Sequence, residues 1–280
     1  MPREPFSRQQ ACLRAGREKG HRMRAHFVLA HPEPASFNAH LVRSGVEVLE
    51  AGGWTTTVSD LYAMGFDPCE RREHYEDRGD PLRFDVQAEQ RRASENDTLP
   101  AHVVEELGRM DRADLLVLQY PMWWHLPPAM LKGWFDRVLA CGAAYTSTKR
   151  FEDGRFVGKR GMLSVTVGTS RETYMHDGRS GDIDLMLWPV NFTLAYAGFT
   201  VLEPFVAYGV EAGLRYSDPA AIKTRLKGIV AEFRANLKDL DRRAVVPFNR
   251  KAEWGANGRI VPGAPVYSPF IRRRQDLDLE

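Results

Sequence analysis

The sequence predicts an α/β protein with a doubly wound, five-stranded parallel sheet and helices on both faces. Two observations carry this prediction. Five short apolar runs alternate along the chain with longer segments in which apolar residues recur at helical spacing. Most of the apolar runs are continuous rather than alternating, which is typical of strands that helices cover on both sides. Strands and helices in this order place consecutive strands parallel in one sheet.

The individual elements follow from these patterns in chain order. The expected strands are His26–Ala30, Thr55–Leu61, Asp114–Tyr120, Gly161–Gly168 and Thr200–Val210. The expected helices are Asn38–Gly53, Leu99–Met110, Ala129–Ala140, Asp182–Gly198 and Asp218–Leu240. The first helix ends at glycines suited to a helix C-terminus. The fourth is apolar on most faces, which predicts cover from a second subunit as well as the sheet, and it is interrupted by Pro189.

The two ends of the chain differ from its middle. Residues 1–22 are basic and lack the apolar stretch of a secretory signal, so we interpret them as a flexible N-terminal extension, with a transit peptide as the alternative. Residues 23–244 form the expected domain, in which the charged segment Gly65–Asn96 is a surface excursion. Residues 245–280 are rich in proline and glycine and are expected to run over the surface without a regular element.

Composition narrows the functional classes. With 43% hydrophobic and 27% charged residues, the 280-residue chain has the composition of a globular protein with a substantial core. A formal net charge of +2 gives no reason to expect nucleic acid as a partner, and no apolar run approaches the roughly 20 residues of a membrane-spanning helix. The three cysteines are scattered, which fits a cytoplasmic protein and predicts neither a disulfide framework nor a metal site.

Ligands of open parallel sheets bind beyond the carboxyl ends of the strands, so the loops after three of the strands are candidate site segments. The first loop, His31–Asn38, lacks the GxGxxG pattern. It has Ser36 and Asn38 at the start of a helix, whose N–H groups and dipole favour a phosphate. His31 could add a hydrogen bond or a charge. The alternative is that Ser36 and Asn38 only cap the helix.

The second loop carries the stretch "PMWWH" directly after a buried strand. Pro121 forces an extended exit from the strand, and Met122, Trp123, Trp124 and His125 then fall in the loop. Flat aromatic side chains at this place suit a planar conjugated ring such as a flavin isoalloxazine. The alternative is that the tryptophans cover the hydrophobic core.

The third loop spans Thr166–Asp182. Gly168 and Thr169 allow a ligand to approach the backbone closely, and Tyr174 offers a hydroxyl group. His176 and Arg179 follow in a segment rich in small residues. A glycine-containing loop without a function is the alternative.

Considered together, these loops and the segments around them resemble the NAD(P)H:quinone oxidoreductases, the DT-diaphorase family of flavodoxin-like flavoproteins. Its bacterial branch also includes modulators of drug activity. The matching stretches are "LAHPEPASFN", "SDLYAMGFDP", "QYPMWWHLPPAMLKGWFDRV", "LSVTVGTS…Y" and "GDIDLMLWP…YAGFTVLEP". They follow the order of the family over roughly residues 23 to 240.

The resemblance implies a flavodoxin-like fold, bound FAD and a homodimer. It further implies hydride transfer from NADH or NADPH to the flavin and then to a quinone, with the two substrates using one site in turn. By position, cofactor binding is expected from three groups of residues. They are His31, Ser36, Phe37 and Asn38 for the phosphates and ribityl chain; Pro121, Met122, Trp123, Trp124 and His125 for the ring; and Thr166, Val167, Gly168 and Thr169 for its pyrimidine edge.

Tyr174, Tyr145 and His176 are the candidates for catalysis, with Arg179 as the alternative to His176. Tyr174 resembles the family tyrosine that also contacts the cofactor and supports negative charge at the flavin N1/O2 edge, where a preorganised donor supplies a few kcal/mol. Tyr145 resembles an aromatic residue on the acceptor side, contributed across the dimer. The family's relay histidine is Ser180 here, so His176 or Arg179 is the candidate substitute.

The resemblance also leaves parts of the function open. A second family tyrosine is replaced by Ser147, so the acceptor preference of the animal enzymes is not expected to carry over. A flavoprotein regulatory subunit of a potassium efflux system is one alternative, and an FMN-dependent azoreductase or nitroreductase is another. The sequence selects neither NADH nor NADPH, and it does not name the physiological acceptor.

Overall fold

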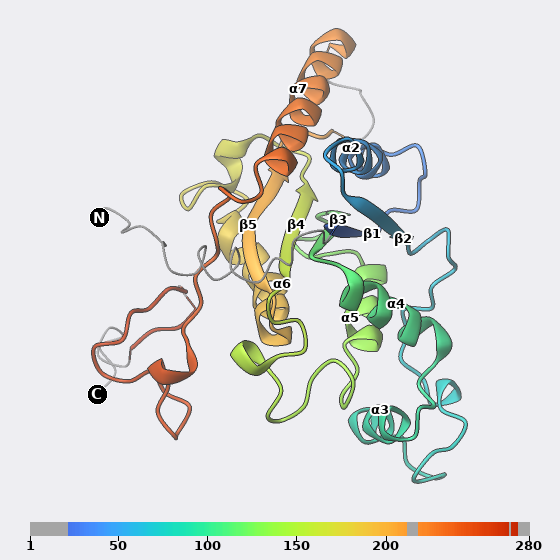
Figure 1. Ribbon diagram of the computed structural model, residues 1–280. Helices are drawn as coiled ribbons and strands as arrows, with labels where there is room; N and C mark the ends of the chain where they lie inside the picture. Colours follow the sequence, from blue (N-terminus) through green and yellow to red (C-terminus); the bar gives the residue numbers. More distant parts are fainter. Residues whose placement is uncertain (1–21, 212–217, 269, 274–280) are drawn as a thin grey trace.

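The computed structural model describes residues 22–211, 218–268 and 270–273 (Figure 1). Apart from Arg22, the expected N-terminal extension lies outside these residues. The sheet consists of β1 (Arg24–Leu29), β2 (Thr55–Asp60), β3 (Leu115–Pro121), β4 (Arg160–Thr166) and β5 (Thr200–Ala207). All four pairings are parallel, and the strand order is β2-β1-β3-β4-β5. The predicted five-stranded parallel sheet is therefore confirmed.

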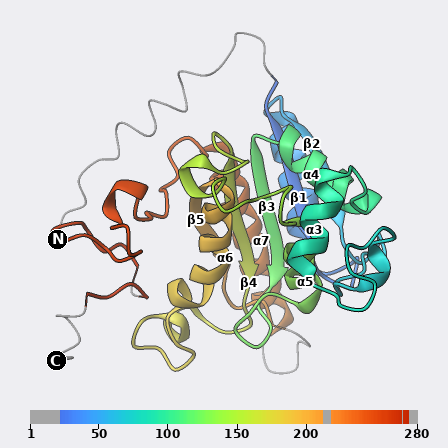
Figure 2. The same cartoon turned by 90° about the horizontal axis from the view of Figure 1, so that it is seen from below.

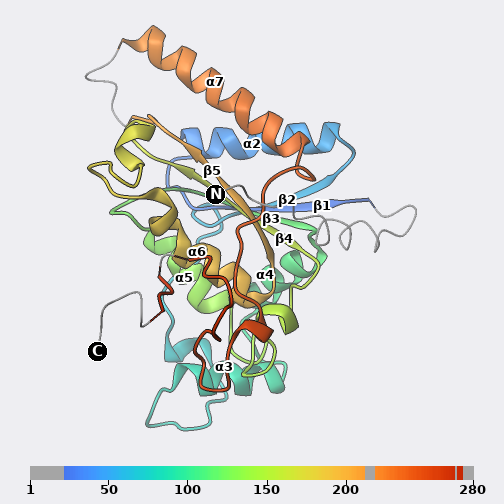
Figure 3. The same ribbon diagram turned by 90° about the vertical axis from the view of Figure 1, so that its left-hand side faces the viewer.

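Helices cover both faces of this sheet, as Figure 3 shows. One face carries α2 (Phe37–Ala51) and α7 (Pro219–Lys238), and the other carries α4 (Ala101–Arg112), α5 (Ala129–Val138) and α6 (Ile183–Ala197). Phe27 of β1 packs into the core on the α2 side, whereas the next residue, Val28, packs into the core on the α5 side. Because both faces of the inner strands are buried, their sequences are mostly apolar and do not alternate between apolar and polar residues.

Two details differ from the sequence-based expectation. The charged excursion contains a helix, α3 (Val86–Glu95), which begins where the Asp85 side chain accepts a hydrogen bond from the backbone N–H of Ala88. It lies on the outer side of α4 and α5 (Figure 1). In addition, α6 runs through Pro189 instead of being interrupted there. A proline within a helix removes one backbone hydrogen bond, and burial of Leu187 and Leu194 on either side of it holds the helix together.

The described part of the C-terminal segment, residues 245–268 and 270–273, runs along β5 and α6 (Figure 2). Its start pairs with the edge of the sheet, where the backbone N–H of Val246 donates to the carbonyl of Val201 at 2.9 Å. Beyond that point it contains a single short 3-10 turn, Lys251–Glu253, within the described range. Among the described residues, no helix combines the length and apolar character needed to span a bilayer.

Candidate functional site

The three predicted loops meet at one edge of the sheet. Strand β3 lies between β1 and β4, so their carboxyl ends are adjacent. The backbone N–H of Met122 donates to the carbonyl of Thr166 at 2.9 Å, which joins the second loop to the third. The rings of His31 and Trp123 lie 6.1 Å apart between their centroids, which places the first loop beside the second. We call this edge the ligand rim.

A buried polar network holds the base of the ligand rim. The amide nitrogen of Asn38 donates to Thr166 Oγ1 at 3.0 Å, and the amide nitrogen of Gln119 donates to Asn38 Oδ1 at 2.8 Å. All three side chains are buried. Gln119 Oε1 is buried without a partner among the described residues, but the bonds between the three side chains still favour a single arrangement of the elements that carry them, here α2, β3 and β4. Asn38 and Thr166 therefore lie beneath the rim and position it.

The start of α2 leaves backbone N–H groups free at the ligand rim. Ser36 Oγ accepts a hydrogen bond from the backbone N–H of Ala39, so this side chain caps the helix, as the alternative interpretation predicted. The N–H groups of Phe37 and Asn38 have no acceptor within the helix. The backbone N–H of Glu33 donates to His31 Nδ1 at 3.0 Å, so a neutral His31 ring carries its proton on Nε2. Burial lowers the pKa of His31, which favours this neutral form.

The second loop turns sharply at its two aromatic residues. Trp123 and Leu126 exchange backbone hydrogen bonds of 3.0 and 3.1 Å. The two residues between them have positive φ values, 52° for Trp124 and 64° for His125. Asn-Gly usually occupies such a turn, and bulky residues there cost about 1–3 kcal/mol each. This strain is typical of functional loops.

The same turn excludes the core interpretation of the tryptophans. Trp124 is 93% exposed and Trp123 is 41% exposed. Neither side chain covers the hydrophobic core in the way that Trp134 does, whose ring is completely buried. Two indole rings held in solvent at the ligand rim are available to a flat partner.

The third loop folds back on the segment that follows β5. Val210 donates its backbone N–H to the carbonyl of Val167 at 2.9 Å, and Gly209 donates to the carbonyl of Thr169 at 2.8 Å. At Gly178, a Cβ would lie 2.5 Å from the carbonyl of Glu172, so only glycine fits there. The loop conformation therefore depends on close backbone contacts.

Tyr174 is half-buried in this loop, and its ring lies 6.1 Å from that of Tyr208. The backbone N–H of Ser180 donates to the carbonyl of Thr173, which brings Ser180 next to Tyr174 along the loop. His176 and Arg179 are exposed. Within the described part of the chain, neither makes a hydrogen bond or an ion pair through its side chain, so no contact ties them to Tyr174.

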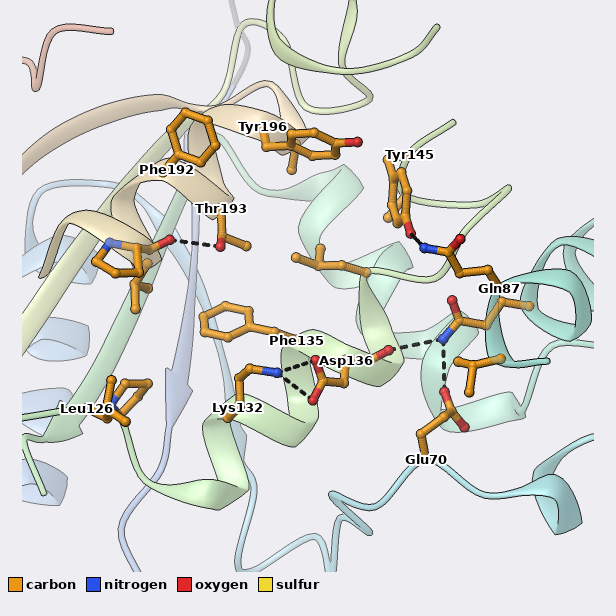
Figure 4. A pocket seen from close by; sticks show the side chains of 18 of the residues that line it. Glu70, Gln87, Leu126, Lys132, Phe135, Asp136, Tyr145, Phe192, Thr193 and Tyr196 are labelled. Carbon is orange, nitrogen blue, oxygen red and sulfur yellow. Dashed lines mark hydrogen bonds and ion pairs between the residues drawn. The ribbon is translucent and has the colours of Figure 1, made fainter. Parts of the chain in front are cut away.

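An apolar cleft of about 730 Å³ opens beside the second loop (Figure 4). Leu126 and Pro127 of that loop line it, together with side chains from α3, α5 and α6. Tyr145 lies at its wall, 5.6 Å from the ring of Tyr196 and 3.4 Å from the amide nitrogen of Gln87. Burial raises the pKa of Tyr145, so its hydroxyl remains protonated at neutral pH.

The structure thus adds residues that the sequence did not single out. Gln119 completes the buried network, Tyr208 lies beside Tyr174, and Tyr196 forms the cleft wall with Tyr145. A polar residue inside the apolar run "LLVLQY" could have pointed to Gln119. Tyr196 and Tyr145 are far apart in the sequence, and only the packing of α6 brings them together.

The parts of the ligand rim fit a flavin. The free N–H groups at the start of α2 suit a phosphate. The exposed indoles offer flat surfaces for a ring. At Gly168 the backbone is open to a ligand, because an added Cβ would meet only the carbonyl of Val210, at 3.9 Å.

The strand order and the ligand rim define a flavodoxin-like α/β protein, whose ligands bind where the strand order reverses. A family model described as flavodoxin-like fold matches residues 23–231. NAD(P)H dehydrogenase [quinone] 1 of Cavia porcellus is 42% identical over 189 residues, covering 67% of this chain and 69% of that protein. Ribosyldihydronicotinamide dehydrogenase [quinone] of Homo sapiens is 35% identical over 230 residues, covering 81% and 95%.

Solved structures agree with these relatives. A Klebsiella pneumoniae protein described as a candidate quinone reductase is 31% identical, with a TM-score of 0.75 over 86% of this chain and 92% of that one. The chain belongs to the NAD(P)H:quinone oxidoreductase family of flavodoxin-like proteins. The predicted family is therefore confirmed.

Proposed function

We propose that this protein is a flavin-dependent NAD(P)H oxidoreductase that reduces quinone-like acceptors by two electrons, with both substrates using one site in turn. The observation that carries the proposal is the meeting of three post-strand loops at one ligand rim, where the loop that exposes two indoles also lines an apolar cleft through Leu126 and Pro127. Family membership supports the reaction class. When bound, the flavin accepts a hydride from the nicotinamide and passes it to the quinone, which takes up a further proton to become a hydroquinone.

We propose FAD as the flavin. In this proposal the backbone N–H groups of Phe37 and Asn38, with the Nε2–H of His31, bind its phosphates. The loop from Pro121 to His125 covers the ring, and the segment Thr166–Thr169 follows its pyrimidine edge. The side chains of Asn38 and Thr166 act from below the rim through their mutual hydrogen bond. FAD rather than FMN follows from the family resemblance.

The cleft is the proposed acceptor side, and a homodimer is the proposed assembly. Tyr145 and the apolar face of α6 would then meet the ligand rim of the partner subunit. Leu126 at 58% and Leu185 at 36% exposure are apolar residues that such an interface would cover. A cytoplasmic location is also proposed, which fits the free thiols of Cys69 and Cys141.

The experiment that tests the function starts from the purified protein. Its released chromophore is identified, and anaerobic reduction by NADH and by NADPH is followed before a panel of quinones is added. We expect FAD, bleaching by at least one nicotinamide, and reoxidation by quinones. The same preparation should sediment at twice the 31.8 kDa chain mass. A colourless protein that takes up neither FAD nor FMN would overturn the proposal, and a strict monomer at micromolar concentration would overturn the dimer.

Tyr174 is proposed to donate a hydrogen bond at the pyrimidine edge of the flavin. Replacing it by phenylalanine removes only the hydroxyl, so we expect FAD to remain bound while reduction by NAD(P)H slows by about tenfold to a hundredfold. Stopped-flow measurement of flavin bleaching gives the rate, and flavin absorbance gives the occupancy. Tyr208→Phe is the matched control for loss of a neighbouring hydroxyl. Unchanged bleaching in Tyr174→Phe would remove the assigned role.

A further inference from the structure

An exposed cation with no carboxylate partner among the described residues lies against Tyr196, one of the aromatic residues that line the cleft. The guanidinium carbon of Arg150 is 5.9 Å from the centroid of the Tyr196 ring. Tyr196 and Tyr145 lie side by side on one wall of the cleft (Figure 4). We propose that Arg150 binds an anionic substituent of the electron acceptor, so that the protein prefers planar aromatic acceptors carrying a sulfonate or a carboxylate. This inference rests on the proposed function and names the substrate class of its acceptor side.

The backbone around Arg150 is held in place. The preceding turn is closed by Thr146, whose hydroxyl oxygen accepts the backbone N–H of Lys149 at 2.9 Å. The following residue, Phe151, has a φ of 53°, a conformation that a bulky residue keeps only where its surroundings impose it. Its ring packs 5.0 Å from Tyr196 and 5.7 Å from Phe192. A strained and anchored segment thus holds Arg150 against Tyr196, next to the residues that line the cleft.

The carboxylates on the same segment already have partners. Glu152 accepts the backbone N–H of Lys251 at 2.8 Å, and Asp153 pairs with the ammonium group of Lys251 at 2.9 Å. Arg150 is exposed, and no carboxylate pairs with it among the residues that the structure describes. Its charge is therefore available to an incoming anion.

The acidic groups inside the cleft are compensated as well. Asp136 is bonded to Lys132, at 2.5 and 2.7 Å. Glu70 accepts from the amide of Gln90 at 2.9 Å, and its other oxygen lies 3.8 Å from Arg137. The apolar lining between them favours a planar hydrocarbon ring. An aromatic acceptor seated there would meet a positive charge at the Tyr196 end, without an opposing unpaired carboxylate.

The chemistry of the side chain favours an oxyanion. A guanidinium presents parallel N–H donors that match the oxygens of a carboxylate or a sulfonate, and it keeps its charge at every physiological pH. A solvated arginine resting on a tyrosine would show none of this selectivity, so acceptor charge distinguishes the two interpretations.

The test compares matched pairs of probes on the flavin-loaded protein. Turnover is measured with naphthoquinone sulfonate and with unsubstituted naphthoquinone, and binding is measured by calorimetry with naphthalene sulfonate, which is not reduced. We expect Arg150→Gln to weaken naphthalene sulfonate binding about tenfold and to lower the kcat/KM ratio of sulfonated to neutral quinone by a similar factor. For Arg150→Lys both values should lie between those of Arg150→Gln and the unaltered protein, because lysine keeps the charge and lacks the paired N–H donors.

Lys149→Gln is the matched control, because it removes the same charge one residue away, from an exposed side chain that lies over no aromatic ring within the described part of the chain. Lys149→Gln should change naphthalene sulfonate binding and the kcat/KM ratio by less than about twofold. Added salt should reduce the preference of the unaltered protein for the sulfonated quinone. Equal sulfonate binding in Arg150→Gln and the unaltered protein would overturn the inference. No turnover of neutral naphthoquinone by the unaltered protein would instead overturn the proposed function, while the calorimetry would still decide the role of Arg150.

Discussion

Replacing Trp123 and Trp124 together by alanine should lower the affinity for flavin roughly a hundredfold, because two flat side chains against a ring contribute about 3 kcal/mol. The folded state should change little, since these side chains are 41% and 93% exposed and contribute little to the core. Titration of the flavin-free protein with FAD, read by quenching of flavin fluorescence, gives the dissociation constant. Thermal unfolding without flavin gives the stability.

Trp254→Ala is the control for loss of an indole elsewhere. Trp254 lies in the C-terminal segment, where its backbone bridges to Ile260, and it belongs to neither the ligand rim nor the cleft. Its replacement should leave the FAD dissociation constant within about twofold. If the double variant bound FAD as tightly as the unaltered protein, the strained turn at the rim would have no part in holding the cofactor.

Much of the fold could be predicted because its strands are buried on both faces. Phe27 and Val28 face opposite cores, so the apolar run at β1 has no polar alternation and can be distinguished from an exposed strand. The location of the ligand rim followed from the same reasoning, since parallel strands bring their carboxyl ends to one edge. Both predictions depend on local sequence patterns and on topology.

Other features depend on contacts that the sequence does not display. The strain at Trp124 and His125 is imposed by the backbone pair of Trp123 with Leu126, and residue type alone would have argued against such a turn. Continuation of α6 through Pro189 depends on burial on either side of the proline. The contact of Arg150 with Tyr196 joins a loop to a distant helix. These are tertiary effects that override local preference.

Glu106 is the clearest case of a residue whose importance only packing reveals. On the sequence it belongs to the polar part of an amphipathic helix, yet its side chain is completely buried. Its carboxylate accepts hydrogen bonds from Ser59 Oγ at 2.7 Å, from Arg109 at 2.7 Å and from Trp134 Nε1 at 2.8 Å. It thereby ties α4 to β2 and to α5.

Replacing Glu106 by alanine should therefore lower the free energy of unfolding by about 3–5 kcal/mol, because the Arg109 charge and the Trp134 N–H lose their buried acceptor. Glu105→Ala is the matched control. Glu105 is the preceding residue and also pairs with Arg109, but its side chain is 57% exposed, so its loss should cost less than about 1 kcal/mol. Urea unfolding of flavin-free proteins compares the two. An equal loss of unfolding free energy in the two variants would show that the buried Glu106 carboxylate stabilises the fold no more than the exposed Glu105 carboxylate does.

The pH dependence of stability gives Glu106 a second signature. Burial raises the pKa of Glu106, but the His26 ring 3.9 Å away and hydrogen bonds from Ser59 and Trp134 outweigh it and hold the pKa below its usual value of 4.5. A carboxyl whose pKa is lower in the folded state contributes stability above its unfolded pKa and loses that contribution as the pH falls through the folded pKa. Between pH 7 and pH 3, the unaltered protein should therefore lose more stability than Glu106→Gln, which cannot titrate at this position.

The Glu106→Gln variant should also weaken FAD binding, because Trp134 lies in α5, which begins just after the second loop. An unchanged dissociation constant for FAD would show that the bond between Glu106 and α5 does not influence the ligand rim.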